Sequence, residues 1–191
     1  MPPPATDRPE IDLPEKDRYT YADYQLLPEG APYELIHGHL VMSPSPSPRH
    51  QTVQSNLFFE LSRFVRTNEK GQVFSAPLDV QLSDTDVLQP DLLYVHRDRL
   101  DCIGEQSIEG APDLVAEILS PATAHRDLTE KKRLYEKHGV REYWVVDLDT
   151  EAVEVFWNAE NRFEQVVRVV ESGTVESTVL DGLKIDLADL F

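Results

Sequence analysis

The most constraining feature of this sequence is a strand–helix–strand unit over residues 112–147. Residues 114–119 form an apolar run of strand length that lies between two prolines. An amphipathic helix follows and ends at Gly139, and residues 140–147 form a second apolar strand. Because such a helix must bury its apolar stripe against a sheet, the unit predicts a mixed α/β fold.

One residue of the first strand, Glu117, does not suit an apolar core. Burying a carboxylate without a partner is costly, so we expect a cation or a proton beside it. Side chains alternate along a strand, which places Glu117 on one face with Asp113, Val115 and Leu119. The ionisable residues on that face form either a functional site or a buried ion pair.

The helix of the unit contains a lysine, Lys131, that could be the cation beside Glu117. Leu128, Lys131 and Tyr135 have the spacing i, i+3, i+7, so they are expected to share one stripe. Lys131 therefore lies on the face that packs against the sheet. The alternative is that its aliphatic chain is buried while its amine reaches solvent.

The rest of the chain predicts further elements around this unit. Residues 1–17 are rich in proline and charge, so we expect a disordered tail, followed by a single domain over residues 18–191. The expected elements are helices over residues 21–27 and 49–70, strands over 33–36, 40–42, 73–76, 78–82 and 92–95, and hairpin strands over 152–157 and 163–170. This order predicts a central mixed sheet flanked by helices, with additional antiparallel hairpins.

The charge of the chain limits its partners. The 35 acidic residues outnumber the 18 basic ones, and the net charge is −17, which argues against nucleic-acid binding by a broad basic surface. The single cysteine, Cys102, excludes an intramolecular disulfide and a zinc site of several cysteines. We expect a cytoplasmic protein, because a reducing compartment suits this composition, and no membrane span, because no apolar run approaches about 20 residues.

Two carboxylates occupy neighbouring predicted strands. Asp91 follows Pro90 and opens one apolar strand, and Glu117 lies inside the next strand that can pair with it. Two such acids make an oxygen-rich site for a hard cation, Mg²⁺ or Mn²⁺, beside which Lys131 could stabilise developing charge. The alternatives are a turn residue at Asp91 and a core ion pair at Glu117. Asp113 also follows a proline, but it lies on the same strand as Glu117 and adds no second strand to a site.

Five blocks of the chain carry a family resemblance. They are residues 33–38 (YELIHG), 42–50 (MSPSPSPRH), 90–92 (PDL), 112–121 (PDLVAEILSP) and 127–144 (DLTEKKRLYEKHGVREYW). In this order they resemble the Uma-two family of restriction-endonuclease-like proteins, in the PD-(D/E)XK nuclease superfamily. The resemblance implies a restriction-endonuclease-like fold with Asp91 and Glu117 as ligands of Mg²⁺ or Mn²⁺.

The resemblance also bears on three other residues. Glu34 resembles an extra acid near the start of the superfamily core, and His50 matches a family histidine at the start of a helix. His50 is either a proton carrier or a structural residue. The superfamily lysine, two residues after the second acid, is replaced here by Leu119, so Lys131 is the candidate for its role.

Two functions remain open from the sequence. One is a metal-dependent endonuclease that hydrolyses phosphodiester bonds, with DNA as the expected substrate. The other is a catalytically inactive nuclease-fold module for binding or assembly, which Leu119 and the negative charge favour. The basic residues around the central helix form either a nucleic-acid groove or a solvated helix face; they are Arg126, Lys132, Arg133, Lys137 and Arg141. A homodimer is also expected, through the edges of apolar strands over residues 153–157 and 166–170.

Overall fold

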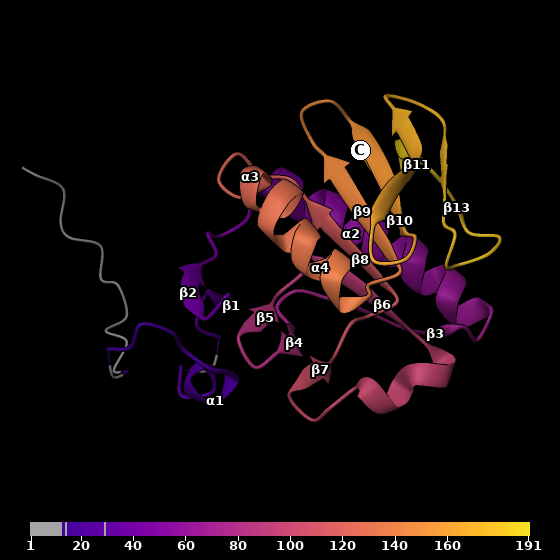
Figure 1. The fold of residues 1–191 in the computed structure, drawn as a ribbon. Helices are drawn as coiled ribbons and strands as arrows, with labels where there is room; N and C mark the ends of the chain where they lie inside the picture. Colours follow the sequence, from indigo (N-terminus) through magenta and orange to yellow (C-terminus); the bar gives the residue numbers. More distant parts are fainter. Residues whose placement is uncertain (1–12, 14, 29) are drawn as a thin grey trace, which may run out of the picture.

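The computed structural model describes residues 13, 15–28 and 30–191, and Figure 1 shows their arrangement. The main element is a six-stranded mixed sheet in the order β11-β10-β9-β8-β6-β3. Only β8 and β9 are parallel neighbours in it; the other pairs are antiparallel. Its strands are β3 Gly71–Ser75, β6 Leu92–His96, β8 Leu114–Ile118, β9 Glu142–Asp147, β10 Ala152–Asn158 and β11 Phe163–Val170.

A second sheet of five strands has the order β2-β1-β5-β4-β7. Its strands are β1 Tyr33–Ile36, β2 His39–Met42, β4 Asp79–Ser83, β5 Asp86–Leu88 and β7 Ser107–Glu109. A small hairpin near the C-terminus joins β12 Thr174–Glu176 to β13 Lys184–Asp186. Strand β1 of the second sheet carries the buried acid Glu34.

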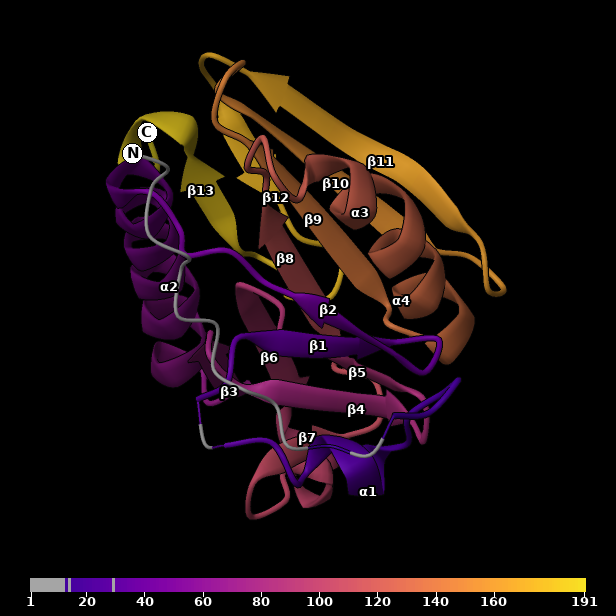
Figure 2. The same ribbon diagram turned by 90° about the vertical axis from the view of Figure 1, so that its left-hand side faces the viewer.

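Helices cover both faces of the large sheet. The helical segments are α1 Tyr21–Tyr24, α2 Pro48–Thr67, η1 Arg97–Cys102, α3 Ala124–Arg126, η2 Asp127–Lys131, α4 Lys132–His138 and η3 Leu187–Asp189. Figure 2 shows α2 and α4 on opposite sides of the sheet. The buried face of α2 packs with Ala116 and Ile118 of β8, whereas Tyr135 of α4 packs with Val115 of the same strand. The alternation expected for β8 is therefore confirmed.

The expected mixed sheet with flanking helices and added hairpins is confirmed. The long helix begins at Pro48, where Ser47 caps it, and ends at Thr67. Three strands of three residues, β5, β7 and β12, were not expected, because such short segments carry too little alternation to be recognised. The disordered tail expected over residues 1–17 falls mainly on residues outside those described.

The expected position of Leu128 was wrong. Its side chain is 43% exposed, whereas Asp127 is buried together with Lys131. The cause is that Asp127–Lys131 is a π-helical turn, whose i→i+5 hydrogen bonding is wider than that of an α-helix and shifts the residues that precede α4. The hydroxyl of Tyr143 donates a 3.0 Å hydrogen bond to the Asp127 carbonyl oxygen in this turn.

In the part of the chain that the structure describes, no helix is long and apolar enough to cross a membrane.

Candidate active site

Strand pairing brings Asp91 and Glu117 together. Leu92 of β6 lies opposite Ala116 of antiparallel β8, so the residues just before Leu92 and just after Ala116 are neighbours. The backbone N–H of Ile118 donates a 2.7 Å hydrogen bond to Oδ2 of Asp91. The Asp91 N–H makes a longer contact, 3.4 Å, with Oε2 of Glu117. Each carboxylate thus accepts a backbone N–H from the segment that carries the other, at the end where β6 begins and β8 ends.

Lys131 supplies the buried cation of the site. Its Nζ lies 3.0 Å from Oε1 of Glu117, 2.9 Å from Oε1 of Glu34 and 3.5 Å from Oδ1 of Asp127. Burial lowers the pKa of Lys131, but the surrounding carboxylates raise it by more, so the pKa lies well above its ordinary value and the amine stays charged. Tyr135, one turn further along the helix, donates a 2.7 Å hydrogen bond to the same oxygen of Glu117.

Glu34 reaches the site from the second sheet. Besides Lys131, its carboxylate accepts a 2.9 Å hydrogen bond from the Gln89 backbone N–H and one of 3.3 Å from the Ser43 hydroxyl. Arg126 lies 3.5 Å from its second oxygen. These partners occupy both oxygens, so Glu34 mainly holds Lys131 and joins the two sheets.

His50 contacts the site from the first turn of α2. Its Nε2 donates to the Ile118 carbonyl oxygen at 3.0 Å and lies 3.2 Å from Oδ2 of Asp91. Burial lowers the pKa of His50, but the hydrogen bond and charge of Asp91 outweigh it, so the pKa is raised. Its buried Nδ1 has no hydrogen-bond partner within the described residues. His50 is therefore a protonatable group in direct contact with a site carboxylate.

The site holds more buried acid than base. Three carboxylates surround the amine of Lys131, those of Glu34, Glu117 and Asp127, and Asp91 adds a fourth negative charge near Glu117. Burial raises the pKa of Glu117 well above its usual range; Lys131 opposes the rise, and the three neighbouring acids add to it. Burial also raises the pKa of Asp127, whose Oδ1 has no hydrogen-bond partner among the residues described. Added positive charge would stabilise the ionised form of this cluster.

The cluster opens into a pocket of about 560 Å³. All five sequence-predicted residues line it: Glu34, His50, Asp91, Glu117 and Lys131. The remaining wall comes largely from the segment between β2 and α2, from the first turns of α2 and from the loop that follows β8. The acids therefore face a space large enough for a small ligand.

Sequence reasoning assigned no site role to Asp127 or Tyr135. Their spacing of four residues on either side of Lys131 was the available signal, since such residues share a helical face. Gln89 and Arg126, which hold Glu34, gave no sequence signal because their contacts depend on how the second sheet packs.

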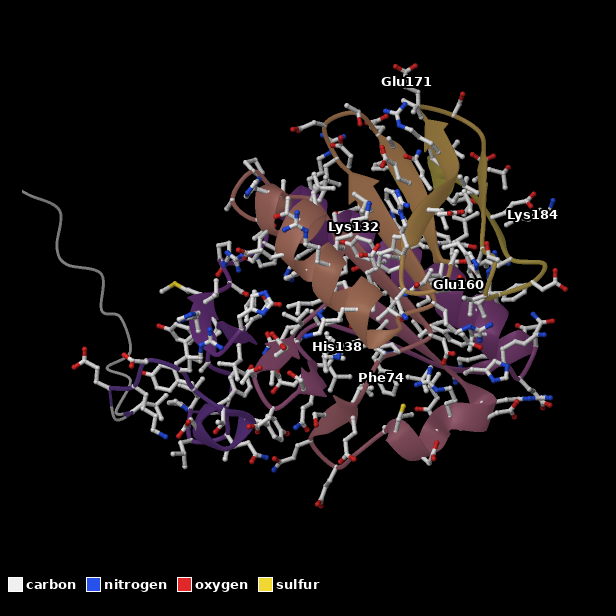
Figure 3. The ribbon with its side chains drawn as sticks, viewed as in Figure 1. Phe74, Lys132, His138, Glu160, Glu171 and Lys184 are labelled. Carbon is white, nitrogen blue, oxygen red and sulfur yellow. The ribbon has the colours of Figure 1, made fainter. Side chains whose placement is uncertain are left out.

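The basic residues around the central helix do not surround the pocket. Lys132 and His138 mark the two ends of α4 (Figure 3), and the amine of Lys132 lies 3.2 Å from the centre of the Phe156 ring. Arg141 pairs with Asp113. Of the five basic residues, Arg126 alone contacts a site carboxylate, and none of the five lines the pocket.

Within the described ranges, no group of three or more His, Cys, Asp or Glu side chains has the arrangement of a metal site. Asp91 and Glu117 still suit a hard cation. Oε2 of Glu117 accepts only one long hydrogen bond among the described contacts. The described side-chain contacts of Asp91 all involve its Oδ2 atom and not its Oδ1 atom. Both groups offer the oxygen donors that Mg²⁺ and Mn²⁺ prefer, and the surplus of acid favours a cation.

Comparison with known proteins is consistent with this geometry. The Uma2 family model, described as "Putative restriction endonuclease", matches residues 20–188. The chain is similar to a crystal structure of a "putative nuclease belonging to DUF820" from Anabaena variabilis, with 25% sequence identity and a TM-score of 0.74. That match covers 90% of this chain and 97% of the other. No curated protein matches. Family and fold together support nuclease function in general terms.

Proposed function

Because the chain belongs to the Uma2 family of restriction-endonuclease-like proteins, we propose that it hydrolyses phosphodiester bonds with the help of a divalent cation, and that DNA is its substrate. The observation that carries the proposal is that Asp91 and Glu117 each accept a backbone N–H from the segment of the other, at a pocket, with the Lys131 amine 3.0 Å from Glu117. Oxygen ligands, a buried cation and room for a phosphate are the parts that this reaction needs.

Asp91 and Glu117 would hold Mg²⁺ or Mn²⁺. Bound there, the cation would polarise a phosphoryl oxygen and lower the pKa of a water molecule. The contacts of Glu34 with Lys131, Arg126 and Gln89 make it a positioning residue. Glu34 is therefore assigned to hold the lysine amine in place.

Hydrolysis adds the oxygen of one water molecule to phosphorus and breaks one P–O bond, and the departing oxygen must receive a proton. Lys131 is assigned to orient the water and to stabilise the negative charge that develops on the phosphate oxygens. His50 is assigned to carry the proton, because its ring lies at the pocket, 3.2 Å from Asp91, and the hydrogen bond and charge of Asp91 raise the pKa of the imidazole against the effect of burial. Tyr135 holds Glu117 through its hydroxyl.

The decisive experiment measures cleavage of plasmid and single-stranded DNA with Mg²⁺ or Mn²⁺. We expect Asp91→Asn to lower the rate by about 100-fold or more, as loss of a group that acts in the transition state does. The matched control is Asp181→Asn, which changes an exposed aspartate outside the pocket and should cut at the wild-type rate. Cleavage that survives Asp91→Asn would contradict the assignment.

Cation binding gives a second readout. Calorimetric titration with Mn²⁺ should show binding to the wild type and to Asp181→Asn, and loss of it in Asp91→Asn and Glu117→Gln. Unchanged Mn²⁺ affinity in both site variants would remove the proposed ligand pair.

A specific observation supports the inactive-module alternative. Leu119 stands two residues after Glu117, and the substitute, Lys131, already contacts three carboxylates. A lysine amine that is held by three carboxylates is not free to contact a substrate. If the folded protein binds Mn²⁺ but releases no product from any phosphodiester, this alternative takes the place of the enzyme.

We also propose a homodimer through the outer edge of the large sheet. β11 is the terminal strand of that sheet, and Val166 in it is 49% exposed. β10 has a neighbour on each side and so offers no edge. Light scattering that shows only a monomer at micromolar concentration would contradict the dimer.

A further inference from the structure

The wall of the pocket is neutral and rich in proline. Five prolines from four separate segments line it: Pro32, Pro44, Pro46, Pro77 and Pro121. Proline has a fixed φ and no backbone N–H, so these five residues present stiff, apolar surface and no backbone donor. Serine, glutamine, alanine and glycine supply most of the remaining wall. The acidic cluster is therefore the one strongly charged part of the described lining.

Cations that could follow a nucleic-acid backbone are missing from this wall. Lys131 is the only Lys or Arg among the lining residues of the described chain, and three carboxylates already surround it. Arg49, at the start of α2, pairs with Glu151, and Arg141 pairs with Asp113. Proteins hold duplexes and long single strands by neutralising many phosphates with Lys and Arg, and this pocket offers no such row.

The size of the pocket suits a small ligand. Its volume of about 560 Å³ lies within the range of about 300–1,000 Å³ that is usual for small-molecule sites. Such a pocket encloses one nucleotide more readily than it follows a rod of duplex DNA. The volume of the pocket, its lack of a row of cations and its proline-rich wall all favour a small ligand over duplex DNA.

From these observations, and resting on the proposed function, we propose that the site accepts one nucleotide unit at a time. The reacting phosphodiester would lie at Asp91, Glu117 and Lys131, and the attached nucleoside would occupy the neutral proline-lined wall. Such a unit has two sources, the free end of a single strand or a small free phosphodiester. In either case the interior of a closed strand or of a duplex does not fit.

The experiment compares four substrates with the wild-type protein and Mn²⁺. They are thymidine 5′-(4-nitrophenyl phosphate), a linear single-stranded 20-mer, the same 20-mer closed into a circle, and supercoiled plasmid. We expect the circle and the plasmid to react at least about 100-fold more slowly than the preferred small or linear substrate, since they cannot place one unit in the pocket. Reaction of the linear strand identifies strand ends as the source, and reaction of the nitrophenyl ester alone identifies free phosphodiesters.

The outcomes separate this inference from the proposed function. If the circle and the plasmid are cut as fast as the linear strand, the protein is a nuclease and the inference is wrong. If none of the four releases product, the proposed function fails and the inference fails with it.

A pair of tryptophan variants tests the pocket itself. Gln51 is an exposed residue of α2 that lines the pocket, and Gln72 is an exposed residue of β3 outside it. Gln51→Trp should raise the KM for the preferred small or linear substrate by about tenfold, because the added ring takes space that the nucleoside needs. Gln72→Trp should leave KM unchanged. Equal KM values in the two variants would overturn the placement of the nucleoside.

Discussion

The two ends of β8 carry buried acids with opposite electrostatic surroundings. Asp113 precedes the strand and is fully buried, with Arg99 at 3.2 Å, Arg141 at 3.5 Å and the His96 backbone N–H at 2.8 Å. Glu117, near the other end, has one cation, Lys131, which it shares with two more carboxylates. The first end has two cations for one acid, and the second has one amine shared by three acids.

From this difference we infer a structural role for Asp113 and a role in the proposed site for Glu117. Two arginines and a backbone donor satisfy Asp113, and it does not line the pocket that Glu117 faces. Glu117 faces a pocket, and burial and neighbouring acids raise its pKa. An excess of buried negative charge lowers the stability of the fold, and residues with strongly shifted pKa values in a pocket are typical of functional sites. The Glu117 end is therefore the better candidate for the site. Both acids were on the predicted face of β8, and only their partners distinguish them.

Removal of one cation from each end gives the largest expected effect. Lys131→Met should lower the free energy of unfolding by about 3–5 kcal/mol, because it leaves buried carboxylates without their cation. Arg141→Met should cost at most about 1 kcal/mol, because Arg99 remains and the Arg141 side chain is half exposed. Urea denaturation of both variants at neutral pH without divalent cations measures the two values. Equal losses would mean that the two ends do not differ in charge balance.

The second prediction concerns the stabilisation of the fold by divalent cations, which should depend on Glu117 and not on Asp113 and should be somewhat smaller than the effect of Lys131→Met. A ligand that binds only the folded state stabilises it by about 2.7 kcal/mol at a concentration of 100 times Kd, so Mn²⁺ should raise the Tm of the wild type and EDTA should reverse the rise. Asp113→Asn should keep this shift, although its starting Tm is lower, and Glu117→Gln should lose it. A shift that disappears in Asp113→Asn and persists in Glu117→Gln would reverse the comparison.

The smallest effect concerns a third buried acid, Asp86, which has histidines beside it. His138 Nε2 lies 3.9 Å from its carboxylate. Burial and Lys137 lower the pKa of His138 from its ordinary value of 6.5, and Asp86 opposes this only in part. Because the unfolded chain takes up this proton at higher pH than the folded one, stability should fall as the pH drops below 6.5.

His138→Gln removes this proton uptake. The loss of unfolding free energy between about pH 8 and about pH 5 should therefore be smaller in the variant, by about 1 kcal/mol or less. Denaturation at the two pH values measures the difference. A larger acid loss in the variant than in the wild type would mean that the charged form of His138 stabilises the fold.

Much of the large sheet and of the site's membership could be predicted from the sequence. The strand β8, the long helix α2 and the inward position of Lys131 follow from apolar spacing, which is a local property. The short strands β5 and β7 could not be predicted, because three residues carry no usable pattern. The face of Leu128 was mispredicted because a π turn depends on the packing around it, including the Tyr143 hydroxyl bound to the Asp127 carbonyl.

The sequence by itself determined the secondary structure around Glu117 and the presence of a buried acid and an inward lysine. The tertiary structure decided which groups meet. Glu34 reaches Lys131 because a second sheet packs on the first, and Asp91 reaches Glu117 through the register of β6 on β8. It also left the basic residues of α4 away from the pocket. Spacing along the chain sets which face a side chain occupies, whereas distances between charges depend on the packing of elements far apart in sequence, and those distances set pKa values and cation binding.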